Sequence, residues 1–148
     1  MITINAMNNS KELRELIRML ERKLGILSKN ESTYSGLTLA QCHAVVEIGR
    51  AKNISLNELA DILNLDSSTM SRTVNNLVNS DLAFRELDPE DRRYVTIKLT
   101  EKGTKIFEET EENMNKYFNE IYEFIPGEKK PQVIESLQIL LEAIKDKY

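Results

Sequence analysis

The sequence predicts a mostly α-helical fold with one small β-hairpin, and three observations support this prediction. Apolar residues recur at every third or fourth position through most of the chain, which is the period of an amphipathic helix. Between residues 82 and 99 the period changes to two, as in a strand that is buried on one face. The turn-rich segment DPEDRR divides that stretch, so it is expected to fold into a two-stranded hairpin.

Length and composition exclude several classes of protein. The 148 residues, of which 41% are hydrophobic, fit one domain covering residues 1–148. A single cysteine cannot form an intramolecular disulfide, and one cysteine with one histidine cannot form a zinc finger, so we expect no metal and no cofactor. No apolar run approaches the roughly 18 residues of a membrane span, and the start lacks a signal-peptide pattern, so we expect a cytoplasmic protein with no membrane partner.

The N-terminal half predicts two helices. Residues 10–30 form an amphipathic pattern that begins at the potential cap Ser10, and a polar, irregular segment follows from Asn30 to Gly36. Thr38 can cap a second helix, which we expect to end near residues 51–53.

Residues 55–79 predict two short helices joined by a tight turn. Ser55 caps the first, with Glu58 at the spacing of a capping box. Asn64 tolerates the left-handed backbone that the turn needs, and Asp66 or Ser67 caps the second helix. One side of this second helix carries its apolar residues, namely Met70, Val74, Leu77 and Val78. The opposite side is short, polar and able to form hydrogen bonds; it holds Ser68, Thr69, Arg72, Asn75, Asn76 and Asn79.

Two further helices follow the hairpin. Thr100 caps a long one that carries an aromatic stripe. Pro126 and Gly127 interrupt it, and a last apolar stripe runs from Val133 to Ile144.

The predicted order of elements, a helix-turn-helix followed directly by a hairpin with a basic tip, is that of a winged helix-turn-helix. In such proteins the second helix of the motif enters the DNA major groove. Base edges there offer partners to Arg, Asn, Ser and Thr, which are the residue types on the predicted outward face. Ser67 and Ser68 at the helix start can hold a phosphate, and Arg92 and Arg93 in the tip can reach the neighbouring minor groove or backbone. Double-stranded DNA is therefore the expected partner.

Three segments closely resemble the MarR family of bacterial transcriptional regulators. They are the wing string DRRYVTIKLTEKG, from Asp91 to Gly103, and the helical strings LTLAQCHAVVEI and NELADILNLDSSTMSRTVNNLV. The resemblance implies a homodimer that binds a pseudo-palindromic operator. Because members of that family are usually repressors, it also implies a repressor. In that arrangement residues 38–100 are the winged DNA-binding region, and residues 10–30 and 101–148 are the dimerisation helices.

The resemblance also assigns roles in the wing. It implies that Arg93 enters the minor groove, that Asp91 buttresses it, and that Asp88 helps to hold the tip. The chain departs from the family at Asp81, where the family usually has glycine before the strand that follows the recognition helix. Because Asp tolerates a left-handed conformation less well than Gly, we expect slight strain at this corner.

Family members often bind a small aromatic or phenolic effector, and four residues are candidates for such a pocket or for a sensor. They are Cys42, His43, Phe107 and Tyr117. Each also has a simpler interpretation: Cys42 as a packed small hydrophobe, His43 as a structural residue and the two aromatics as core. The sequence names no specific effector.

The sequence also allows two other functions, a protein-binding module and an enzyme. Residues 55–100 carry an excess of acidic groups, which would fit a winged-helix module that binds protein instead of DNA. The retained Arg72 and wing arginines argue against that alternative. An enzyme has little support, because the scattered glycines form no phosphate-binding loop and one histidine supports no catalytic triad.

Overall fold

The computed structural model describes residues 2–147 of the chain, with side-chain positions for residues 8–25 and 36–145. It divides into two compact units, the first extending through Thr110 and the second starting at Glu111. Within the described residues no helix is long and apolar enough to cross a membrane.

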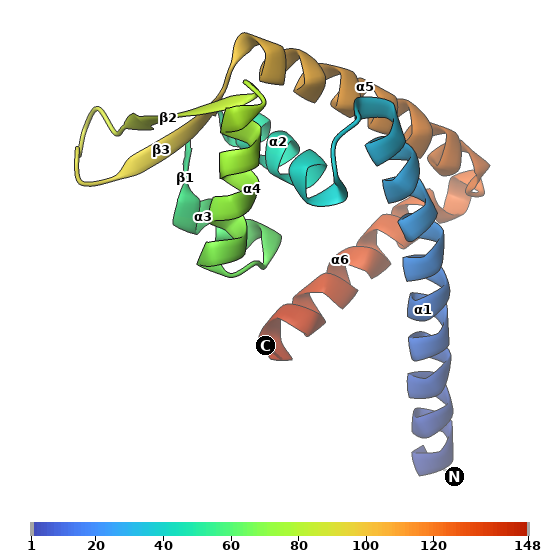
Figure 1. Cartoon of the computed structure of the whole chain (residues 1–148). Helices are drawn as coiled ribbons and strands as arrows, with labels where there is room; N and C mark the ends of the chain where they lie inside the picture. Colours follow the sequence, from blue (N-terminus) through green and yellow to red (C-terminus); the bar gives the residue numbers. More distant parts are fainter. Residues whose placement is uncertain (1, 148) are drawn as a thin grey trace. The chain divides into compact units, whose positions relative to one another are not determined.

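The first unit contains four helices and a small sheet, and it also holds the start of a fifth helix (Figure 1). Helix α1 spans Ile2–Ser35, α2 spans Leu39–Ala51, α3 spans Leu56–Leu63 and α4 spans Ser67–Asn79. Strands β1 (Ile54–Ser55), β2 (Ala83–Leu87) and β3 (Val95–Leu99) form an antiparallel sheet in the order β1-β3-β2. This order of helices and strands confirms the predicted winged helix-turn-helix.

The remaining helices carry the chain to its end. Helix α5 spans Glu101–Phe124, so it begins in the first unit and ends in the second. A short 3-10 helix at Gly127–Lys129 leads into α6, Lys130–Lys147. The predicted interruption at Pro126 and Gly127 is therefore confirmed.

The predicted boundaries of the first helix are wrong. Ser10 lies inside α1 and does not cap it, and the segment expected to be irregular continues the helix to Ser35. Polar residues of modest propensity can extend a helix that already exists, because extension costs far less than nucleation. The helix ends before Gly36, whose φ of 72° is the left-handed conformation that glycine adopts readily.

Local capping explains where the next helices start and stop. Thr38 forms a complete capping box with Gln41 at the start of α2. The Ser55 hydroxyl accepts a hydrogen bond from the Glu58 backbone N–H. The Glu58 carboxylate accepts from the Ser55 hydroxyl, whereas in a capping box it would accept from the Ser55 backbone N–H. Asn64 has a left-handed backbone at the turn between α3 and α4, as predicted.

The core of the first unit lies between the helices and one face of the sheet. It includes the fully buried residues Ile48, Leu59, Met70, Leu77 and Ile97. Strand β1 was not predicted, because two residues are too few to show a period; it pairs Ile54 with Ile97 and Ser55 with Thr96 of β3. The sheet therefore has three strands, whereas the sequence predicted two.

Candidate nucleic-acid interface

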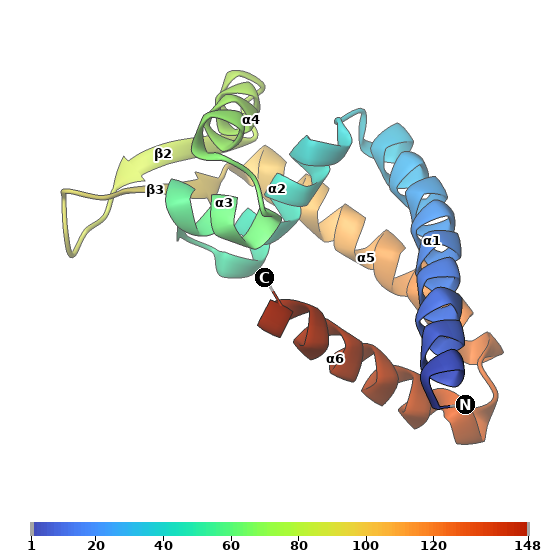
Figure 2. The ribbon, with the colours of Figure 1, turned by 90° about the horizontal axis from the view of Figure 1, so that it is seen from below.

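Helix α4 is fixed by its buried side. Met70, Val74 and Leu77 have no measurable exposure, Thr73 is also buried, and Val78 is half-buried against the same core. The helix packs against α2, α3 and β2. Both views show α4 beside the sheet, with the hairpin tip extending away from α2, α3 and α4 (Figures 1 and 2). A rigid inner face therefore holds the outer face of α4 in a fixed orientation.

The outer face of α4 presents the polar residues that the sequence singled out. Five of the six predicted contact residues on this helix are exposed and Thr69 is half-buried; the exposed ones are Ser67, Ser68, Arg72, Asn75 and Asn76. The face carries no acidic side chain between Ser67 and Asn79. Its composition suits hydrogen bonding to base edges and phosphates.

Asp66 organises the N-terminus of α4. Its carboxylate accepts hydrogen bonds from the Ser68 hydroxyl, from the Thr69 hydroxyl at 2.6 Å and from the Thr69 backbone N–H at 3.0 Å. These hydrogen bonds, that from Ser68 first, hold the pKa of the Asp66 carboxyl well below its usual range. The carboxylate therefore stays ionised at neutral pH and caps the helix.

This cap changes what the start of α4 can offer a phosphate. The hydroxyl protons of Ser68 and Thr69 are donated to Asp66, so in this conformation their oxygens can only accept from a further partner. A phosphate is itself an acceptor, which leaves the Ser67 hydroxyl and the first backbone N–H groups as its donors here. The sequence suggested a cap at Asp66 or Ser67 but gave no sign of this network.

A second contact on α4 was missed by sequence reasoning. Arg85, on β2, donates a hydrogen bond from its guanidinium to the side-chain oxygen of Asn75. Both residues are exposed, so the pair lies on the outer surface. The available signal was the period of two, which places Arg85 on the same strand face as the buried Ala83.

An ion pair within the wing tip holds the Arg93 side chain. Asp91 accepts from Arg93 Nε at 2.9 Å, from Nη2 at 2.7 Å and from the Arg93 backbone N–H at 3.1 Å. The guanidinium lowers the pKa of Asp91, and the carboxylate raises the pKa of Arg93. The Arg93 side chain remains 83% exposed, and Arg92 beside it is exposed too. The pair orients the Arg93 side chain without burying it.

Asp88 shapes the other side of the tip. Its carboxylate accepts from the Glu90 backbone N–H at 2.9 Å, and its own N–H donates to the Tyr94 carbonyl at 2.9 Å. Both acidic residues assigned to the wing therefore hold the loop from within, by hydrogen bonds typical of turn-forming Asp.

The corner after α4 is closed by Asp81, which has a φ of 60°. Asp81 N–H donates to Val78 O and Leu82 N–H donates to Leu77 O, which is the Schellman pattern at a helix end. Thr100 locks the corner to the next helix by donating its hydroxyl to the Asp81 carbonyl at 2.7 Å and accepting from the Gly103 N–H at 3.0 Å. The predicted left-handed backbone at Asp81 is thus confirmed.

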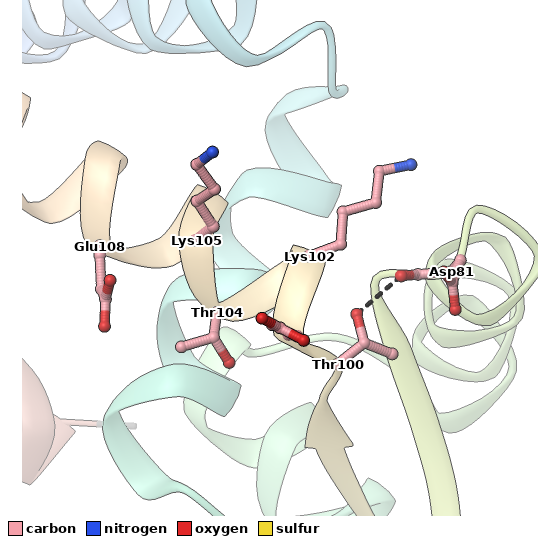
Figure 3. Close-up of a pocket in the computed structure, with 7 residues that line it drawn as sticks. Asp81, Thr100, Lys102, Thr104, Lys105 and Glu108 are labelled. Carbon is pink, nitrogen blue, oxygen red and sulfur yellow. Dashed lines mark hydrogen bonds between the residues drawn. The ribbon is translucent and has the colours of Figure 1, made fainter.

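A shallow depression lies beside this corner at the start of α5. Figure 3 shows Lys102 and Lys105 extending to one side of the helix and Glu108 to the other. Its lining is polar and of mixed charge: Asp81, Thr100, Glu101, Lys102, Thr104, Lys105 and Glu108. None of the four effector candidates contributes to it.

The four effector candidates occupy different environments. Cys42 is buried in α2, 2% exposed, whereas the adjacent His43 is exposed. Phe107 is half-buried with its ring against Gly49, where a Cβ would come within 2.5 Å of it. Tyr117 lies in the second unit, 41% exposed, with its ring edge-on to Phe118. Among the described residues no group of three or more His, Cys, Asp and Glu could hold a metal ion.

Two helices joined by a tight turn, followed by a small sheet whose hairpin carries exposed arginines, define a winged helix-turn-helix protein. Residues 35–93 match the model described as MarR family. The chain is 27% identical over 115 residues to HTH-type transcriptional regulator BilQ of Clostridium symbiosum, covering 78% of this chain and 80% of that one.

Two solved structures share this fold. A MarR family protein from Bacillus stearothermophilus superposes with a TM-score of 0.82 at 23% identity, covering 93% of this chain and 96% of that one. A cysteine mutant of MarR from E. coli complexed with operator DNA gives a TM-score of 0.71 at 26% identity, with 89% and 92% covered. The winged region of the chain is similar to the MarR family, and these likenesses support a DNA-binding transcriptional regulator.

Proposed function

We propose that the chain is a repressor that binds a pseudo-palindromic operator as a homodimer, with α4 in the major groove and the wing beside it. The observation that supports this most is the two-sided character of α4. Its inner side is packed in the core, and its outer side presents exposed polar residues and no carboxylate between Ser67 and Asn79. The MarR of E. coli, a relative of this chain, has been solved with operator DNA.

The proposed contacts divide into two kinds. On α4, Ser67, Ser68, Thr69, Arg72, Asn75 and Asn76 face base edges and the adjacent phosphates. In the wing, Arg92 and Arg93 provide the exposed cations, while Asp88 and Asp91 hold the loop that carries them. The winged region of the proposal is residues 38–100.

The dimer is proposed from apolar side chains that a single chain leaves exposed. On α1 they include Leu13, Leu16 and Leu20, and on α6 they include Leu137, Leu141 and Ile144, each between 43% and 66% exposed. Exposed apolar surface of this extent is typical of a protein interface. In this proposal residues 10–30 and 101–148 provide the dimerisation helices.

The regulatory step follows from geometry. Two copies of α4 must match half-sites about one helical turn, roughly 34 Å, apart. A small aromatic or phenolic effector that binds better to another spacing would release the operator, and it can shift the equilibrium only by that difference in affinity. Cys42, His43, Phe107 and Tyr117 stay candidates for contacts to it.

The test is selection of a random duplex pool by the purified protein at physiological salt, followed by sequencing. We expect enrichment of an inverted repeat whose half-sites are one turn apart. The double variant Arg72→Ala, Arg93→Ala is the control, since it removes two proposed contacts while both side chains are exposed and outside the core. If the wild-type chain enriches no motif and is retained only weakly and in a salt-sensitive way, the proposal is wrong and a protein partner becomes the better hypothesis.

A further inference from the structure

The contact between Arg85 and Asn75 fixes the orientation of a side chain on the proposed DNA-reading face. Asn75 lies on α4 and Arg85 lies on β2, so the hydrogen bond joins the helix to the wing. The two elements are packed against each other along this edge. The exposed Asn75 amide is therefore held by a neighbour before any DNA arrives.

The chemistry of arginine decides which way the amide faces. A guanidinium carries N–H donors and no acceptor, so the atom of Asn75 that meets it is the oxygen, Oδ1. The amide nitrogen, Nδ2, is left with its two N–H donors for another partner. A side chain that is normally both donor and acceptor thus becomes chiefly a donor.

The strand register explains why Arg85 reaches α4. Arg85 pairs with Ile97 across the β2–β3 ladder, and Ala83 two residues earlier pairs with Leu99. Ile97 and Ala83 are buried on the face of the sheet that lies against the core. Arg85 extends from the same face nearer the hairpin tip, where it is exposed and bonded to Asn75.

We propose that Arg85 is a specificity-determining residue that makes Asn75 select bases with acceptors in the major groove, guanine first. An unconstrained Asn reads adenine by donating to N7 and accepting from the N6 amino group. Here that amino group would face an oxygen already bonded to a cation, with further N–H donors beside it. Guanine presents two acceptors, O6 and N7, to the same donor surface. This inference rests on the proposed operator binding.

The experiment repeats the random-duplex selection with four test variants and one control variant. Arg85→Met removes every guanidinium donor but keeps much of the aliphatic stem, and Arg85→Lys keeps a cationic donor. Asn75→Ala removes the amide, alone and combined with Arg85→Met. Lys98→Met is the matched control, because Lys98 is a cation of the same sheet that pairs with Glu86 and lies on the opposite face, opposite Phe84. Thermal unfolding of each variant checks that it is folded.

The expected result is confined to one base pair of each half-site. Arg85→Met lowers the guanine-to-adenine preference there by about tenfold and leaves the other positions unchanged. Arg85→Lys retains the guanine preference. Asn75→Ala removes the base preference at the same position, and adding Arg85→Met to Asn75→Ala causes no further change in that preference. Lys98→Met leaves every base preference unchanged, because Lys98 lies on the opposite face of the sheet from Arg85.

Three results would overturn the proposal, and they differ from a failure of operator binding itself. If wild type enriches an inverted repeat but Arg85→Met keeps every base preference, Arg85 does not act on readout. If Arg85→Met changes base preference equally when Asn75 is already Ala, Arg85 reads the base directly. If it lowers affinity uniformly and reduces the salt dependence, it is a phosphate contact. Enrichment of no repeat by wild type would instead refute the proposed function.

Discussion

Helices α4 and α6 differ in how far their apolar side chains are buried. Met70, Val74 and Leu77 of α4 are completely buried within the first unit, and what remains outside is polar. On α6 the apolar residues Ile139 and Leu141 are 63% and 66% exposed. A helix whose apolar side chains are already buried presents a polar surface, which suits a polar partner such as DNA. A helix whose apolar side chains are exposed suits an apolar partner, such as a second copy of the chain.

The largest expected effect tests how tightly the first unit is packed. Gly103, near the start of α5, is buried, and a Cβ there would overlap the carbonyl oxygen of Leu82. Because backbone cannot move aside as a flexible side chain can, Gly103→Ala should lower the free energy of unfolding by about 3 kcal/mol. Denaturant unfolding at fixed protein concentration measures it.

The same substitution at Gly25 serves as its control. No atom lies within 4 Å of a Cβ built at Gly25, which is exposed within α1. Gly25→Ala should therefore raise stability by up to about 1 kcal/mol through helix propensity. Equal losses at both positions would show that the packing of Gly103 against Leu82 is not what requires glycine.

The second prediction concerns the exposed side of α6. Leu141→Glu should weaken the homodimer by about 2 kcal/mol, close to 30-fold in the dissociation constant, because a charge would enter an apolar interface. Sedimentation equilibrium reports the change. Ile62→Glu is the comparison, since Ile62 is 55% exposed on α3 of the winged unit and should leave the dimer intact. A dimer unaffected by Leu141→Glu would place the interface elsewhere.

The third prediction concerns the exposed side of α4. Arg72→Ala should cost about 1–3 kcal/mol in operator affinity and relax the preference for one base, if the guanidinium reads a base edge. Competition binding against singly substituted operators separates base reading from charge. A loss of the same size on every sequence would make Arg72 a phosphate contact.

The fourth prediction concerns the wing. Arg93→Ala should weaken operator binding about tenfold while folding and dimerisation stay unchanged, because the side chain is exposed and bonded only locally to Asp91. Affinity measured at physiological salt and at a higher salt concentration gives both the loss and the change in slope. Unchanged affinity at physiological salt would remove Arg93 from the interface.

These regions also show which features a sequence can predict. The caps at Thr38 and Ser55 and the turn at Asn64 were predictable because each depends on a few neighbouring residues. The left-handed backbone at Asp81 was expected only from the resemblance to the MarR family. The full length of α1 was not predictable, since its two ends show no clear helical period. The Arg85–Asn75 contact was missed for another reason: it joins two elements whose approach is decided by the core beneath them. Sequence therefore predicted which residues face outward but not how they hold one another.

The smallest expected effect concerns stability and lies at Asp81, in the corner between α4 and β2. Asp81 has a left-handed backbone with φ 60°, a conformation that costs a side chain with a Cβ roughly 1 kcal/mol and costs glycine little. Asp81→Gly should therefore stabilise the protein, by about 0.5 kcal/mol once the greater freedom of glycine in the unfolded chain is subtracted. The hydrogen bonds of this corner use the Asp81 N–H and carbonyl, which glycine keeps. Denaturant unfolding beside Asp81→Ala, which keeps the Cβ but loses the carboxylate, separates backbone strain from charge. Stabilisation by Ala as large as that by Gly would mean that the carboxylate, and not the left-handed backbone, is the unfavourable feature of this corner.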